Sequence, residues 1–169
     1  MFLNSTLPVS LTLYLLYLAA RSWLDKAARQ ESPLNGAYSA AGQYFENSLP
    51  TMRTVWELAR GYADRDYIVF EDERLTYAET DGLVRALAAR LVDDYGVEPG
   101  DRVAIAMRNY PEWVIGYWAV VSIGAACVGM NAWWTPDEMV YGLSDSRPKV
   151  LIADGERVER LLPGLDALR

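Results

Sequence analysis

The sequence has no histidine and only one cysteine, Cys127, among its 169 residues. A zinc site built from His and Cys ligands, a Ser-His-Asp triad and an internal disulfide are therefore excluded for this chain alone. The scarcity of cysteine favours a reducing compartment, and hence a cytoplasmic location, because disulfides persist mainly in oxidising compartments. The sequence predicts no metal-binding residue.

Positive charge is also scarce, since 16 Lys and Arg residues stand against 23 Asp and Glu residues and give a net charge of −7. Nucleic-acid binding needs clustered Lys and Arg to neutralise phosphates, and no such cluster is present. We therefore expect no nucleic-acid partner. With 51% apolar residues, the chain is long enough to form one globular domain with a true core.

Residues 1–30 form an apolar leader or possible membrane-associated helix, but its apolar run is short for a membrane span. Its apolar run, residues 7–20, would be about 21 Å long as a helix, against about 30 Å for the hydrocarbon core of a bilayer. Three alternatives stay open: a surface or amphipathic helix or non-native leader, a membrane anchor over residues 3–20, and a cleaved signal peptide. Arg21 and Lys26 would flank an anchor, whereas a signal peptide should have a basic residue before the run.

Residues 31–51 are predicted to be an irregular linker, because they are rich in Ser, Gly, Asn, Ala and Pro and show no sustained period. Residues 52–169 then form the folded part. Its first element is a helix over residues 54–62, with one apolar face at helical spacing. That face comprises Val55, Leu58, Ala59 and Tyr62.

A β-hairpin is predicted next, with strands at residues 67–70 and 74–76 joined by a polar turn. Thr76 and Glu79 have the spacing of a capping box, so a helix should begin there. Asp81 is expected to lie away from the apolar stripe of this helix. The stripe comprises Leu83, Val84, Leu87, Ala88, Leu91, Val92 and Tyr95.

Three further strands are predicted at residues 103–107, 126–128 and 149–153, and helices separate them. The helices start near Pro111 and at Thr135, and Asp154 is predicted to cap a last helix. Strands alternating with helices imply right-handed crossovers. The predicted fold class is thus α/β, a partial doubly wound and largely parallel sheet with covering helices.

Several short motifs then occur in a fixed order. They are RLTYAE at residues 74–79 and, within residues 96–154, the elements Pro99 to Val103, Asn109 with Glu112, Gly124 with Ala125, Asn131, and Asp145 with Ser146. Together they resemble the early part of the large domain of adenylate-forming (AMP-binding) enzymes, and most closely fatty-acyl-CoA synthetases. Gly129 departs from the pattern, because many relatives have proline there.

The resemblance implies an ATP-dependent acyl-CoA ligase that activates a fatty acid as an acyl-adenylate and passes it to coenzyme A. Such enzymes use ATP, Mg²⁺, a Ser/Thr/Gly-rich loop ending in Pro-Lys-Gly and a lysine on a C-terminal domain. The motifs present here precede that loop, so residues 52–169 would be an incomplete N-terminal domain. We carry over no catalytic, cofactor-binding or metal residue, and we expect no tight binding of these cofactors by the chain alone.

Two functional hypotheses follow from this resemblance. In the first, the chain is an N-terminal fragment of the ligase and is inactive by itself. The alternative is a non-catalytic, membrane-tethered interaction module derived from the same scaffold. The sequence predicts neither the acyl-chain length nor the oligomeric state.

Several residues could have a functional role, but a structural role is expected for each of them. Cys127 has no base available to activate it and is predicted to be a core thiol. Four tryptophans could line an acyl or pantetheine passage but are expected to pack: Trp113, Trp118, Trp133 and Trp134. Glu71, Asp72 and Glu73 are expected at a solvated hairpin tip, and Asp145 and Ser146 in a helix-ending turn.

The leader can be tested by alkaline carbonate extraction of membranes from cells that express the chain. A surface helix is expected in the supernatant, because it is held only at the lipid headgroups. Retention in the membrane pellet would instead indicate an anchor.

Overall fold

The computed structural model describes residues 49–168. The predictions for the leader and for most of the linker lie outside these residues. Among the helices of residues 49–168, none is both long enough and apolar enough to span a bilayer.

The centre of the fold is a three-stranded parallel sheet of β3 (Arg102–Ala106), β4 (Ala126–Gly129) and β5 (Val150–Ala153), in the order β4-β3-β5. Val103 pairs with Cys127 on one side and with Val150 on the other. Residues 103–106 of β3 have no exposed surface. An apolar strand covered on both faces is typical of a central parallel strand, and the predicted α/β fold class is confirmed.

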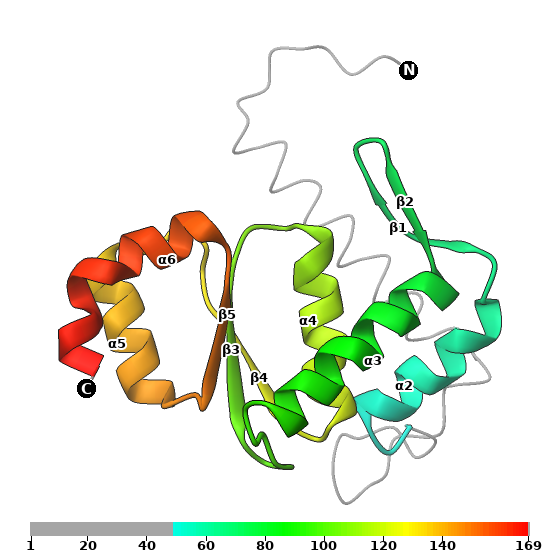
Figure 1. The fold of residues 1–169 in the computed structure, drawn as a ribbon, viewed down its shortest axis with the longest axis horizontal. Helices are drawn as coiled ribbons and strands as arrows, with labels where there is room; N and C mark the ends of the chain where they lie inside the picture. Colours follow the sequence, from blue (N-terminus) through cyan, green and yellow to red (C-terminus); the bar gives the residue numbers. More distant parts are fainter. Residues whose placement is uncertain (1–48, 169) are drawn as a thin grey trace, which may run out of the picture. The chain divides into compact units, whose positions relative to one another are not determined.

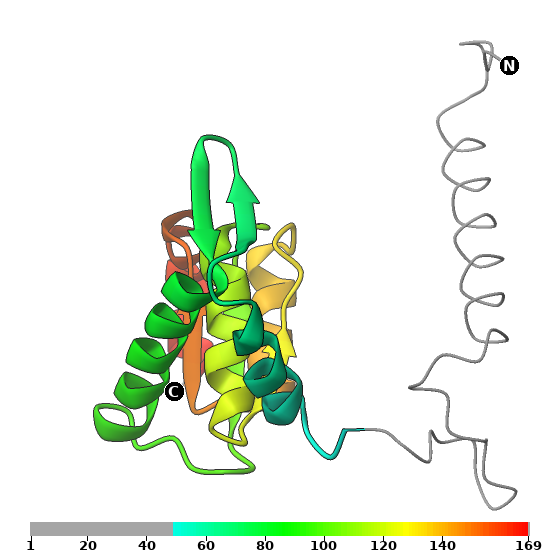
Figure 2. The ribbon, with the colours of Figure 1, turned by 90° about the vertical axis from the view of Figure 1, so that its right-hand side faces the viewer.

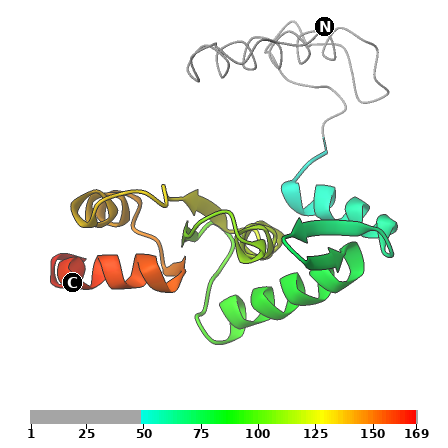
Figure 3. The same ribbon diagram turned by 90° about the horizontal axis from the view of Figure 1, so that it is seen from above.

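Helices cover both faces of this sheet (Figure 3). The helix that follows β3, α4 (Pro111–Ser122), packs on one face with α2 (Met52–Ala59) and α3 (Tyr77–Asp93). The opposite face carries α5 (Pro136–Ser146), α6 (Gly155–Leu161) and the 3₁₀ segment η2 (Leu162–Leu168). Side chains of the sheet alternate between two apolar cores, as a pleated strand requires: Val103 and Val150 face α4, whereas Ala104 and Leu151 face α5.

Close contact between α4 and the sheet depends on Gly116. A Cβ atom at this position would lie 3.2 Å from Cδ1 of Ile105, which has no exposed surface. Glycine therefore lets the helix approach the central strand without displacing a core side chain.

The predicted hairpin is present as β1 (Asp66–Phe70) and β2 (Glu73–Thr76), which pair antiparallel. It projects beyond the helix ends (Figure 2). The predicted capping boxes are confirmed at Thr76 with Glu79 and at Thr135 with Glu138, where side chain and backbone bond reciprocally.

The predicted apolar face of the first helix is wrong in part, because Ala59 packs against the core as expected but Leu58 and Tyr62 do not. α2 ends at Ala59 and continues as the tighter 3₁₀ turn η1 (Arg60–Tyr62), so the spacing assumed for a longer helix is broken. Leu58 and Tyr62 are 61% and 52% exposed, and Trp56 is buried instead. Its ring stacks on Trp118 at a centroid distance of 4.9 Å, and this aromatic contact sets the rotation of the helix.

The prediction that Asp81 lies away from the buried face of its helix is wrong. Asp81 lies on the side of α3 that faces the core and is only 5% exposed. Its Oδ1 accepts a hydrogen bond of 3.1 Å from Nε1 of Trp56, and its Oδ2 accepts from the Arg85 guanidinium. Burial of the indole requires an acceptor for its N–H group. Leu83 and Val92, which were assigned to the buried stripe, are 45% and 43% exposed.

We predict that Asp81→Ala lowers the free energy of unfolding by about 2–3 kcal/mol, since it leaves a buried indole N–H without an acceptor. Asp81→Asn should lose less, because its amide oxygen can still accept. Urea unfolding measures both, with Asp93→Ala on the exposed end of the same helix as the control. Equal stability of Asp81→Ala and Asp93→Ala would show that this hydrogen bond contributes nothing.

Candidate functional site

The three parallel strands end at the same edge of the sheet, and the segments that follow them meet there. The chain leaves β3 toward one face, whereas it leaves β4 and β5 toward the other (Figure 1). In open α/β sheets, such a reversal of direction creates a crevice at the carboxyl ends of the strands, where ligands bind. This edge is therefore the candidate site.

Asp154, the residue after β5, holds the edge together. Its Oδ2 accepts from the backbone N–H of Arg108 at 3.1 Å, which connects it to the end of β3. Its Oδ1 accepts from the backbone N–H of Arg157 at 3.0 Å and so caps α6. Nη1 of Arg157 lies 3.2 Å from both oxygens. Burial by itself would raise the pKa of Asp154, but these hydrogen bonds outweigh it and lower the pKa.

Arg157 connects the same cluster to β4. Its side chain is 1% exposed, and its Nε donates to the carbonyl of Ala132 at 2.9 Å. Arg160 adds hydrogen bonds to the carbonyls of Ala132 and Trp134, at 3.2 and 2.9 Å. α6 thus fixes the loop after β4 through two arginines, a role that was not predictable from their positions in the sequence.

Trp133 contradicts the packing prediction, because it is 66% exposed. The Arg108 guanidinium lies 4.7 Å from its ring centroid, a cation–π distance. Trp134, the next residue, packs in the α5 core, where a Cβ atom at Gly142 would meet its ring at 2.6 Å. The two residues diverge because the loop directs consecutive side chains to opposite sides.

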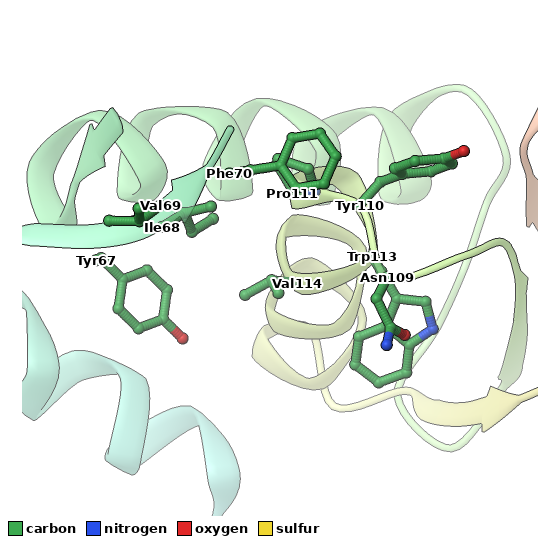
Figure 4. A pocket seen from close by; sticks show the side chains of 9 residues that line it. All are labelled: Tyr67, Ile68, Val69, Phe70, Asn109, Tyr110, Pro111, Trp113 and Val114. Atoms are coloured by element: carbon green, nitrogen blue, oxygen red, sulfur yellow. The ribbon is translucent and has the colours of Figure 1, made fainter. Parts of the chain in front are cut away.

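The packing prediction is confirmed for Trp118, which packs against the core beside α4 and whose Nε1 donates to the hydroxyl of Tyr67 at 2.6 Å. Trp113 stacks on Tyr117 with ring centroids 5.8 Å apart, but it is only half-buried and also lines a hollow beside β1 (Figure 4). Cys127 is half-buried against the same core, and burial raises the pKa of its thiol. Asp145 and Ser146 form the last turn of α5 rather than a turn beyond it.

Two hollows open at this edge, and the hairpin tip forms a wall of both. The larger, about 570 Å³, is lined by Phe70, Glu71, Asp72, Glu73, Met107, Tyr110, Pro111, Glu112, Ala153 and Asp154. The smaller, about 430 Å³, is lined by Phe70, Glu71, Arg108, Asn109, Tyr110, Ala132 and Trp133. The carboxylates of the hairpin tip are exposed, as predicted. Their position beside the ends of β3 and β5 was not predicted, because it depends on contacts between residues that are distant in sequence.

The arrangement is suited to binding rather than to proton transfer. The oxygens of Asp154 already accept hydrogen bonds from three N–H groups, so it acts as a fixed anion. In the smaller hollow, the groups that remain open to a ligand include the Arg108 guanidinium and the rings of Trp133 and Tyr110. Within residues 49–168, no three His, Cys, Asp or Glu side chains are placed to hold a metal ion.

We predict that Asp154→Asn lowers the free energy of unfolding at pH 7 by about 1–3 kcal/mol, since an amide replaces a carboxylate that accepts charged hydrogen bonds. The contribution of Asp154 exists above its pKa in the unfolded chain, about 3.9, and is lost as pH falls through the lower pKa of the folded chain. Urea unfolding at pH 7 and pH 3 should therefore show a difference that shrinks in acid. Asp145→Asn is the control, and a difference independent of pH would contradict the assignment.

Comparisons with known proteins agree with this fold. An oxalate–CoA ligase from Arabidopsis thaliana is 36% identical over 100 residues, which are 59% of this chain and 20% of that protein. A long-chain-fatty-acid–CoA ligase from Yersinia pestis is 33% identical over 109 residues, 64% of this chain and 18% of that protein. The structure of the anthranilate CoA ligase AuaEII in complex with anthranoyl-AMP is 25% identical, with a TM-score of 0.65 over 70% of this chain and 23% of that one.

The chain spans about a fifth of the length of these curated relatives. The family described as AMP-binding enzyme matches residues 55–169, which include every strand and nearly every helix described above. The sheet order, the two capping boxes and this match agree, and the chain therefore belongs to the AMP-binding enzyme family.

Proposed function

We propose that this chain supplies the N-terminal part of the large domain of an ATP-dependent ligase that joins a fatty acid to coenzyme A. In this reaction the carboxylate attacks the α-phosphate of ATP and releases pyrophosphate, and the thiol then displaces AMP from the acyl-adenylate. The observation that carries the proposal is the family match over residues 55–169. Several relatives are named as ligases of carboxylic acids to coenzyme A, whereas others are named as a malpinin synthetase, a bacitracin synthase or a gramicidin synthase.

The contribution of this chain would be structural support and one wall of a binding crevice. Asp154, Arg157 and Arg160 hold the strand ends and the loop after β4 in fixed positions. Preorganised donors and walls are what an adenylation site requires from its scaffold. Trp133 and Arg108 face the smaller hollow from that scaffold, where they could contact the bound acid or the incoming thiol.

The residues of this chain do not fit a phosphate or Mg²⁺ site. The chain has only two lysines, Lys26 and Lys149, and neither follows a Ser/Thr/Gly-rich run. Such a loop cradles phosphates through successive backbone N–H groups and a lysine. We derive no step of the reaction through ATP, Mg²⁺ or coenzyme A from these residues, and the groups that hold them would come from other parts of the enzyme.

Fatty acid is proposed as the acid because the motifs in residues 74–154 resemble those of fatty-acyl-CoA synthetases, and because two relatives are named as ligases of long-chain or medium- and long-chain fatty acids. Oxalate and aromatic acids are the acids named for other relatives. The class of acid is thus the part of the proposal that most needs measurement.

We predict that the 169-residue chain alone releases no pyrophosphate above background when supplied with ATP, Mg²⁺ and palmitate, benzoate or oxalate. The physical reason is the lack of preorganised charge around the phosphates. A chain extended by its downstream coding sequence to the length of its relatives should form the adenylate, with palmitate preferred in kcat/KM.

As a second measurement, the acyl-adenylate is trapped as a hydroxamate, both with the 169-residue chain and with the extended chain. Preference of the extended chain for oxalate or benzoate would contradict only the choice of acid. Pyrophosphate release by the short chain would contradict the assignment of phosphate binding to other parts of the enzyme.

A further inference from the structure

Trp133 projects from the loop after β4, and the peptide groups on both sides of it are held by α6. The carbonyl of Ala132 accepts a hydrogen bond from Nε of Arg157 at 2.9 Å and another from Nη1 of Arg160 at 3.2 Å. The carbonyl of Trp134 accepts from the same Nη1 of Arg160 at 2.9 Å. The backbone before and after Trp133 is therefore fixed by side chains of one helix.

The indole ring of Trp133 lies beside two guanidinium groups. The Arg108 guanidinium is 4.7 Å from the ring centroid and the Arg157 guanidinium is 6.0 Å from it, and both distances allow cation–π attraction. Arg157 thus contacts the ring as well as the backbone carbonyl that precedes it. Arg160 differs, because its hydrogen bonds go to backbone carbonyls and to Glu156.

The charged groups around Arg157 leave its side chain little freedom. Its Nη1 lies 3.2 Å from both oxygens of Asp154 and 2.9 Å from Oε2 of Glu156. Glu156 is shared, because its Oε1 also pairs with Nη2 of Arg160 at 2.6 Å. The Arg108 guanidinium adds a third positive charge beside the ring. The guanidinium of Arg157 is therefore held by two carboxylates on one side and by a carbonyl on the other.

Stability alone does not explain an arginine at this position. The side chain of Arg157 is 1% exposed, and its Nη2 has no hydrogen-bond partner among residues 49–168. A buried N–H group without an acceptor costs free energy, and a buried ion pair often stabilises a fold less than apolar side chains of the same volume do. What the guanidinium supplies is geometry, because its rigid fork directs Nε to a carbonyl and Nη1 to a carboxylate at the same time.

We propose that Arg157 is a positioning residue, which holds the loop after β4 and the indole of Trp133 in one orientation at the carboxyl edge of the sheet. The contacts that carry this inference all lie within residues 108–160, so they do not depend on what covers Trp133 in the complete enzyme. Only its consequence for catalysis rests on the proposed function, in which Trp133 contacts the acid or the thiol.

The orientation of Trp133 is measured by fluorine NMR of the chain labelled with fluorotryptophan, in which Trp133→Phe identifies the signal. In Arg157→Lys we expect this signal to split or to move toward the shift of the free amino acid, because one ammonium group cannot replace both Nε and Nη1. The signals of Trp56 and Trp118, which lie in the core beside α4, should stay in place and report an intact fold.

Arg160→Lys is the matched control, because a single ammonium group can replace Nη1 at both carbonyls, and the Trp133 signal should stay in place. Arg157→Met is the second variant and should displace the signal as Arg157→Lys does. An unmoved signal in both Arg157 variants, or an equal displacement in Arg160→Lys, would overturn the proposal. Loss of the two core signals in both Arg157 variants would overturn it as well, because Arg157 would then support the whole fold.

In the chain extended to the length of its relatives, the effect of Arg157 should pass through Trp133. We expect Arg157→Lys and Trp133→Ala each to lower kcat/KM for thioester formation by about tenfold, as for a misplaced group at a binding site. The double variant should lose no more than Trp133→Ala alone, because residues that act as a unit are not additive.

Equal losses caused by Arg157→Lys with and without Trp133, or full activity of Trp133→Ala, would overturn the proposal. An extended chain without ligase activity would contradict the proposed function instead, and the orientation measured by NMR would be unaffected.

Discussion

The rest of the structure depends on the burial of β3 on both faces. Four successive residues of this strand are fully buried, and their side chains alternate between two cores. Such a strand is stable only if helices cover both sides of the sheet. The chain must therefore cross from one face to the other between consecutive strands, and that crossing opens the crevice at the carboxyl ends.

The crevice is stabilised by a small polar network in which one carboxylate connects several backbone segments. Asp154 bonds to the end of β3 and to the start of α6, and Arg157 extends the network to the loop after β4. The buried Arg157 guanidinium is tolerable here because it is paired with Asp154 and hydrogen-bonded through Nε and Nη1, although its Nη2 has no partner among the described residues. The network leaves Arg108 and Trp133 at the mouth, on a rigid base, where a ligand can reach them.

The geometry of residues 49–168 agrees with membership in the AMP-binding enzyme family, but neither one by itself identifies the activity. A fold of this class hosts many activities, so the site must be argued from its own residues. In residues 49–168 those residues form the walls and supports of the two hollows at the strand ends. The hairpin borders both hollows through Phe70 and Glu71.

Local elements were predictable from sequence because the interactions that define them are local. The hairpin, the capping boxes at Thr76 and Thr135, and the apolar strand at residues 103–107 each depend on neighbours within a few positions. The error at α2 had a local cause as well, since the helix tightened into a 3₁₀ turn one turn earlier than its apolar spacing indicated.

The sequence by itself determined the α/β class, the order of the elements and the family, because apolar periodicity, caps and ordered motifs are written along the chain. Only the tertiary structure decided that Asp81 is buried beneath Trp56, that Trp133 is exposed while Trp134 packs, and that the hairpin tip borders the strand ends. Each of these depends on contacts between residues distant in sequence. The absence of histidine excluded a triad from the start, and the fold placed arginine, tryptophan and carboxylate groups around a crevice suited to binding.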